Sequence, residues 1–140
     1  MVDKTLLLRK LADLQQYMEQ IGDYSNIRVN EYSEDWKTQR IVERTLQMMI
    51  EICADIASHI ISDSGYRVPK SYADTFKVLY ENKIIEKGLF SKMEKMAKFR
   101  NIIVHHYDKI DEAIIVSILK NDLNDFGKYK DAVINILKTD

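Results

Sequence analysis

The residues best suited to chemistry lie in one short run, Arg100-Asn101-Ile102-Ile103-Val104-His105-His106-Tyr107. A histidine gains and loses a proton near neutral pH. An arginine binds anionic groups such as phosphate through two parallel hydrogen bonds. The run therefore combines a carrier of protons with a binder of anions, and His105 and Arg100 are the candidates for these roles.

Successive residues of an α-helix are rotated by about 100°, which predicts the neighbours within this run. Arg100 and Tyr107 lie one above the other, and Asn101 forms a second pair with His105. His106 falls on the apolar face, so we expect it to be packed and His105 to be available to solvent. Arg100 and His105 lie about 140° apart. They converge only if the helix distorts or ends nearby, or if two copies of the chain line one cleft.

The charge around this run differs from that of the whole chain, which has a net charge of -1. Residues 83–109 contain seven lysines and arginines and three acidic residues, a net charge of +4, which leaves -5 for the rest of the chain. A basic segment on an acidic body steers anionic substrates. Lysines that simply solvate a helix surface would give the same composition.

Other chemistries find little support in the sequence. Three histidines without a Cys-x-x-Cys or His-Glu-x-x-His pattern do not predict a metal site, and the four isolated glycines form no phosphate-binding loop. Cys53 lies in an apolar pattern, where a thiolate is disfavoured. Glu51 and Asp55 are four residues apart, but we expect them on a solvated helix face. We therefore expect no metal and no cofactor.

The elements that carry these residues are all predicted to be helices. Apolar residues at helical spacing indicate helices over residues 3–21, 33–62, 71–82, 91–107 and 111–138, with a bend at Gly127 in the last one. Asp3, Ser71 and Asp111 are suitable helix starts. We expect an all-α, up-and-down bundle of four to five helices that forms a single domain over residues 1–140.

The composition supports this class and excludes others. With 140 residues, 46% hydrophobic content, four Gly and one Pro, the chain suits one helical domain rather than a turn-rich β-sandwich. No apolar stretch reaches the roughly 18 residues of a membrane span or resembles a signal peptide. A single cysteine indicates a reducing compartment. These features predict a cytoplasmic protein that does not enter a membrane.

The helix predicted over residues 33–62 has two apolar stripes, more than one neighbouring helix covers. One stripe consists of Val42, Leu46, Met49, Cys53, Ala57 and Ile60, and the other of Ile41, Met48, Ile52 and Ile56. Either the helix packs on two sides within the monomer, or part of the second stripe is a subunit interface.

The pattern Arg100-Asn101-x-x-x-His105-x-Tyr107 resembles the R-x4-H-x-Y signature of HEPN-type ribonuclease toxins, specifically the HepT-like group of type VII toxin–antitoxin systems. Residues 42–47 and 50–57 resemble the long second helix of that family, and residues 96–99 and 107–111 resemble the flanks of its motif. The similarity covers nearly the whole chain and preserves the order of the helices.

This resemblance implies a homodimeric, metal-independent endoribonuclease with a HEPN-like fold and a cleft at the subunit interface. In such an enzyme the RNA 2′-OH attacks the adjacent phosphate, His105 moves a proton and Arg100 holds the phosphate. Asn101 would orient His105 or a phosphate oxygen, and Tyr107 would contact RNA. The family also implies an MntA-like nucleotidyltransferase antitoxin that AMPylates Tyr107 and so blocks the cleft.

Two other interpretations remain open. The chain could be a non-catalytic HEPN module that presents RNA or another substrate to a nucleotidyltransferase, although the intact motif favours the nuclease. It could also be a structural helical adaptor in which the motif caps a core. The adaptor predicts that Arg100→Ala unfolds the protein, whereas the enzyme predicts a stable and inactive variant.

Overall fold

The structure, a computed structural model, describes residues 2–139, and the regular secondary structure within that range is entirely helical. The elements are α1 (Lys4–Gly22), α2 (Val29–Ser33), α3 (Trp36–Ser64), α4 (Tyr72–Glu81), α5 (Lys87–His105), the 3-10 helix η1 (Tyr107–Lys109), α6 (Glu112–Asn121) and α7 (Asn124–Thr139). The prediction of an all-α fold is confirmed.

The helices begin and end where short-range chemistry favours it. Asp3, Ser71 and Asp111 each cap a helix by accepting a hydrogen bond from a backbone N–H of its first turn, as predicted. Asp35 does the same for α3, with its Oδ1 3.1 Å from the Thr38 nitrogen. Gly65 ends α3 in the left-handed conformation, at φ 71°, which a residue without a Cβ adopts without strain.

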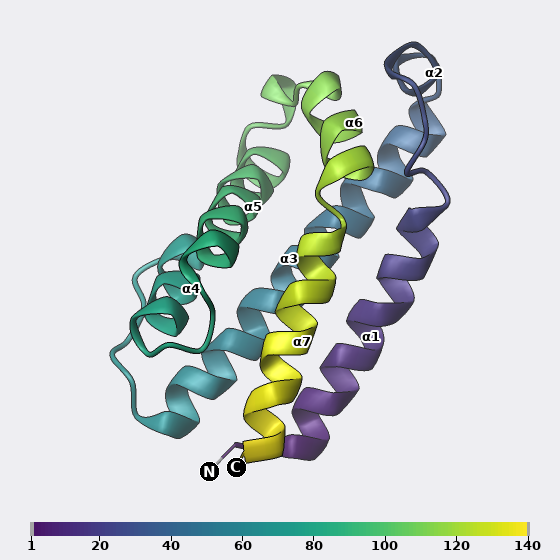
Figure 1. Cartoon of the computed structure of the whole chain (residues 1–140). Coiled ribbons are helices and arrows are strands. Elements are labelled where there is room, and N and C mark those ends of the chain that lie inside the picture. The colour runs from purple at the N-terminus through teal and green to yellow at the C-terminus, as the bar shows by residue number, and fades with distance from the viewer. Residues whose placement is uncertain (1, 140) are drawn as a thin grey trace.

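The long helices alternate in direction and pack around α3 (Figure 1). α1 and α7 lie along one side of α3, whereas α4 and α5 lie along another, and α2 and α6 contact each other at the end remote from the chain termini. The carboxyl end of α5 and the amino end of α3 therefore share one end of the bundle. This arrangement places the Arg100–Tyr107 segment next to the first half of α3.

The first apolar stripe of α3 forms the centre of the core. All six of its residues are buried, as expected: Val42, Leu46, Met49, Cys53, Ala57 and Ile60. Tyr129 of α7 closes the core over this stripe, because its hydroxyl donates a 2.7 Å hydrogen bond to the Cys53 carbonyl. Burial raises the pKa of the Cys53 thiol, so a reactive thiolate is disfavoured.

The second stripe of α3 is only partly covered. Ile56 is buried, Met48 and Ile52 are half-buried, and Ile41 is 49% exposed. Neighbouring helices therefore cover the carboxyl half of this stripe and leave its amino half open to solvent.

Within residues 2–139 the structure has seven α-helices rather than the expected four to five, and several predicted boundaries are wrong. The linker before α3 contains the short helix α2, whose start is stabilised by hydrogen bonds from the Arg28 backbone and side chain to Glu31. α5 begins at Lys87 rather than at residue 91, so Gly88 lies inside it. The last helix breaks at residues 122–123 and not at Gly127. Asp and Asn side chains compete for backbone hydrogen bonds, and Asn121, Asp122 and Asn124 surround that break.

Within residues 2–139, no helix has both the length and the apolar character that crossing a bilayer would require.

Candidate functional site

The end of α5 decides where the candidate residues lie. The His106 N–H still donates to the Ile102 carbonyl at 2.9 Å, but His106 itself leaves the helix at φ -133°. Tyr107 then begins η1. We expected His106 on the buried face and Tyr107 above Arg100. Both expectations are wrong, because the rotation of 100° per residue applies only as far as His105, and both His106 and Tyr107 are exposed.

Arg100 is held by three neighbours and is 13% exposed. Its Nε and Nη2 donate to one oxygen of Glu51, Oε2, at 2.9 and 2.6 Å. Its guanidinium stacks on the Tyr72 ring with 4.2 Å from Cζ to the ring centroid, and Nη1 donates to Asn101 Oδ1 at 3.2 Å. A guanidinium has five N–H donors, so Arg100 is fixed in direction and still has donors for an anion.

Glu51 is a site residue that sequence reasoning missed. We expected Glu51 and Asp55 on a solvated face, but Glu51 accepts hydrogen bonds from Arg100 and, at 3.1 Å, from Gln47 Nε2. Asp55 instead pairs with Lys10 and lies 3.8 Å from His59. Glu51 and Arg100 are 49 residues apart in the chain. No local pattern predicts such a contact, since it depends on how α3 and α5 pack.

His105 and Asn101 are not joined as the helical rotation suggested. Asn101 uses its Oδ1 to accept from Arg100, and His105 is exposed as the last residue of α5. Among the described residues, no hydrogen bond or ion pair links His105 to Arg100.

Tyr107 belongs to a second group of residues, formed with α3. The Arg40 guanidinium lies over the Tyr107 ring, with Cζ 5.0 Å from the centroid, and it also pairs with Glu43, at 3.1 Å from Nη1 to Oε1. Partial burial and the neighbouring Glu43 carboxylate raise the pKa of Tyr107. Tyr107 is nevertheless 47% exposed, so its phenol remains open to a reaction partner.

Both groups are anchored on α3. Glu43 and Glu51 are eight residues apart, which corresponds to about 12 Å along the helix axis. The open part of the second apolar stripe runs from Ile41 to Met48. Glu51 lies about 60° around the helix from Met48, whereas Glu43 lies about 160° around it from Ile41. A protein that covered this stripe would therefore lie closer to the Arg100 group than to Glu43.

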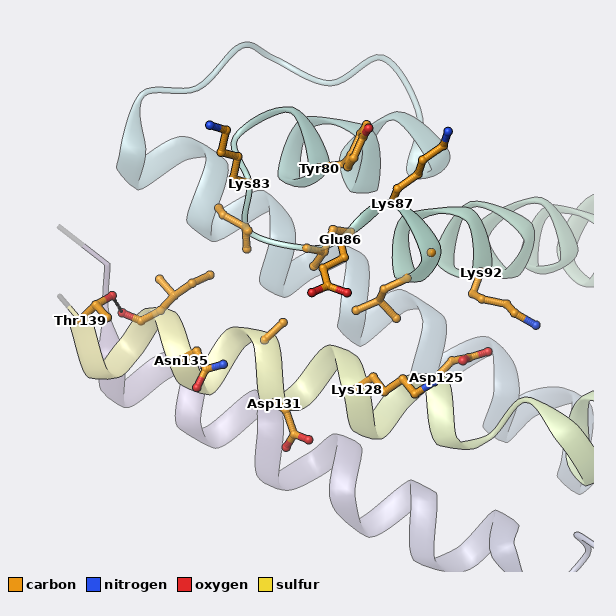
Figure 2. A pocket seen from close by; sticks show the side chains of 16 residues that line it. Tyr80, Lys83, Glu86, Lys87, Lys92, Asp125, Lys128, Asp131, Asn135 and Thr139 are labelled. Carbon is orange, nitrogen blue, oxygen red and sulfur yellow. Dashed lines mark hydrogen bonds between the residues drawn. The ribbon is translucent and has the colours of Figure 1, made fainter.

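A groove elsewhere on the molecule contains none of the candidate residues. It lies between the α4–α5 connection and α7, and has a volume of about 1130 Å³ (Figure 2). Charged side chains of both signs line it, among them Lys83, Glu86, Lys87 and Asp131.

Within residues 2–139, no group of three His, Cys, Asp or Glu side chains lies close enough together to hold a metal ion.

Comparisons with known proteins agree with the resemblance noted in the sequence. A family model described as ribonuclease HepT-like matches residues 14–133. The mRNA nuclease HepT of Shewanella oneidensis is 30% identical over 132 residues, which cover 91% of this chain and 96% of that protein. The tRNA nuclease HepT of Aphanizomenon flos-aquae is 25% identical over 130 residues, which cover 91% and 87%.

Solved structures show the same fold. The tri-AMPylated HEPN toxin of Shewanella oneidensis, in complex with its MNT antitoxin, superimposes with a TM-score of 0.87 at 28% identity. The match covers 95% of this chain and 99% of that toxin. The predicted family resemblance is thereby confirmed.

Proposed function

This chain belongs to the ribonuclease HepT-like family, and from this premise we propose that it is a metal-independent endoribonuclease toxin of a toxin–antitoxin pair. Its relatives are nucleases by name, and one solved relative is an AMPylated toxin bound to its antitoxin. We assign RNA cleavage to Arg100 and His105, and inhibition to AMPylation of Tyr107 by a nucleotidyltransferase partner.

The chemistry needs a proton acceptor and a cation, but no hydrolytic metal. The RNA 2′-OH attacks the neighbouring phosphorus and forms a 2′,3′-cyclic phosphate, while His105 takes the proton from the 2′-OH. The bond to the 5′-oxygen breaks, and this oxygen takes a proton from water and leaves as a hydroxyl. Arg100 binds the phosphate oxygens, on which negative charge accumulates in the transition state. Asn101 supports this step by holding Nη1 of Arg100, a role that differs from the orientation of His105 expected from the sequence.

The observation that carries this proposal is the fixed position of Arg100. Glu51, Tyr72 and Asn101 hold its guanidinium in one direction before any substrate arrives. A donor group that is already positioned stabilises a transition state without the energetic cost of reorganisation.

We propose that the enzyme is a homodimer. Arg100 and His105 do not meet within one protomer, and Ile41, on the open part of the second stripe, is 49% exposed. On α3, this stripe lies closer in rotation to Glu51, the partner of Arg100, than to Glu43. A second copy seated on this stripe would bring His105 of the partner subunit near Arg100. Equilibrium sedimentation then gives twice the 16.5 kDa mass of the chain, whereas a 16.5 kDa species would exclude the composite cleft.

The test of catalysis uses Arg100→Ala and His105→Ala with a synthetic RNA in EDTA. Each variant should lose activity by about 10²–10³-fold. Lys98→Ala is the matched control, because it removes an exposed cation from the same helix. A variant as active as the wild type, or loss of wild-type activity in EDTA, would refute the mechanism.

The same variants separate the nuclease from the two other interpretations. If Arg100→Ala unfolds the protein, the structural adaptor is supported. If the wild-type chain binds RNA in a mobility-shift assay and never cleaves it, the non-catalytic partner of a nucleotidyltransferase is supported.

A further inference from the structure

The group of residues around Tyr107 includes a buried carboxylate that RNA cleavage leaves unexplained. Glu43 is 7% exposed, although glutamates are almost never buried unless they are paired. Its Oε1 accepts a 3.1 Å hydrogen bond from Arg40 Nη1, and the same guanidinium lies over the Tyr107 ring, with Cζ 5.0 Å from the centroid. Glu43 and the residue that would be modified therefore meet at one arginine.

The titratable and charged groups of this cluster surround Tyr32 of α2. Arg40 and Glu43 lie on α3, Tyr107 on η1 and Glu112 on α6. The Tyr32 hydroxyl and Glu112 Oε2 are buried and have no hydrogen-bond partner among residues 2–139. Arg40 is the cation that pairs with Glu43 in this cluster.

Attack by a tyrosine on phosphorus requires that the phenolic proton be removed. Burial and the neighbouring Glu43 carboxylate both favour the neutral phenol of Tyr107, so the free phenolate is scarce at neutral pH. A general base must come within hydrogen-bond reach of the proton that it takes. Glu43 is the carboxylate that shares Arg40 with Tyr107 in the unmodified protein.

We propose that Glu43 is the general base for nucleotidyl transfer to Tyr107, and that Arg40 then binds the transferred phosphate. This inference rests on the proposed function, in which Tyr107 is the modified residue. The Tyr107 oxygen forms a bond to the α-phosphorus of a nucleoside triphosphate held by the partner nucleotidyltransferase. The bond from that phosphorus to the oxygen bridging to the β-phosphate breaks, pyrophosphate leaves, and the phenolic proton passes to Glu43.

The transfer also changes the partner of Arg40. Once Glu43 carries a proton, its ion pair with Arg40 is lost and the guanidinium is free for a new anion. Arg40 already lies 5.0 Å from the centroid of the Tyr107 ring, next to the place where a phosphodiester would be attached. Arg40 is therefore a positioning residue that keeps the modified tyrosine against α3.

The test measures incorporation of radiolabelled AMP from ATP into the full chain by its partner nucleotidyltransferase, under single-turnover conditions. Glu43→Gln preserves the size of the side chain but removes the base, so the rate should fall by about 10²–10⁴-fold at pH 7. Its rate should then rise about tenfold per pH unit and approach the wild-type rate only above the ordinary tyrosine pKa of about 10, because burial raises the pKa of Tyr107. A merely structural role would not produce this convergence.

Two further variants act as controls. Glu34→Gln makes the same change of charge at an exposed residue between α2 and α3, and should be modified at the wild-type rate and with the wild-type pH profile. Glu43→Asp retains a carboxylate and should restore most of the rate, again with the wild-type profile. If Glu43→Gln does not fold, the Glu43→Asp variant provides the test. A modification rate of Glu43→Asp that rises tenfold per pH unit, as expected without a base, would overturn the inference.

The outcomes separate this inference from the proposed function. If the wild-type chain is not modified at Tyr107, the modification part of the proposed function fails, and the role of Glu43 fails with it. If the wild type is modified and Glu43→Gln has the same rate and pH profile, Glu43 is not the base, while the proposed function stands.

Discussion

Replacing Glu51 with Gln tests whether this carboxylate anchors Arg100. The substitution keeps one acceptor oxygen but removes the charge that receives two hydrogen bonds, at 2.9 and 2.6 Å. Ion pairs at a surface contribute about 0–1 kcal/mol, whereas removing one partner of a buried pair costs about 3–5 kcal/mol. Arg100 is 13% and Glu51 31% exposed, so this pair lies between the two limits.

We therefore expect Glu51→Gln to lower the free energy of unfolding by about 1–3 kcal/mol. At about 2–4 °C per kcal/mol, the melting temperature falls by roughly 2–12 °C in a thermal unfolding experiment followed by circular dichroism. Glu94→Gln is the matched control, because Glu94 pairs with Lys98 at 3.9 Å on the surface of α5. That control should change stability by less than about 0.5 kcal/mol.

A double-mutant cycle with Arg100→Met isolates the pair from the rest of the site, since Met retains an apolar stem against Tyr72. Arg100→Met should lower the free energy of unfolding by about 1–2 kcal/mol less in the Glu51→Gln variant than in the wild type. Losses that add to within about 0.5 kcal/mol would show that the two residues act independently. The anchoring of Arg100 by Glu51 would then be refuted.

Three other predictions follow from burial and backbone geometry. Asp125 is buried, its Oδ2 has no partner among the described residues, and burial raises its pKa, so the folded state disfavours its charged form. Asp125→Asn should raise the melting temperature by about 2–4 °C at pH 7. This gain should vanish below about pH 4, where the Asp125 carboxyl group is protonated in the unfolded chain as well as in the folded one. An equal gain at both pH values would contradict this reasoning. Gly65→Ala should lower the free energy of unfolding by about 1–2 kcal/mol, because Gly65 has a left-handed φ of 71° that an alanine adopts only with strain. An unchanged urea midpoint of unfolding would argue against this left-handed cap. Ile41→Glu should shift equilibrium sedimentation towards the monomer, whereas Leu8→Glu, at an exposed site on α1, should not; a mass unchanged by Ile41→Glu would place the dimer interface elsewhere.

The helices that carry the fold were largely predictable because their ends are set within a few residues. Asp3, Ser71 and Asp111 bond to N–H groups two or three positions ahead, and Gly65 ends α3 by its own backbone conformation. The short helix α2 was not predicted, because five residues contain too little periodicity to be recognised. The bend expected at Gly127 is absent, because this glycine lies inside α7, and the helix instead breaks at residues 122–123. Asn and Asp side chains around that break compete for backbone hydrogen bonds.

The candidate site was predictable in its residues but not in its geometry. The spacing of Arg100 and His105 survives, since both lie within α5. The predicted stacking of Tyr107 near Arg100 does not, because α5 ends two residues before Tyr107. The catalytic and RNA-binding roles of Arg100, Asn101, His105 and Tyr107 remain predictions.

The sequence by itself determined the helical class, most helix boundaries and the family, since all three follow from local spacing, capping residues and one compact motif. Only the tertiary structure decided that Arg100 is held by Glu51, and that the Tyr107 ring lies against Arg40, the partner of Glu43. These contacts join residues that are far apart in the chain. They depend on the packing of α5 and η1 against α3, where the rotation and end of each helix fix which side chains meet.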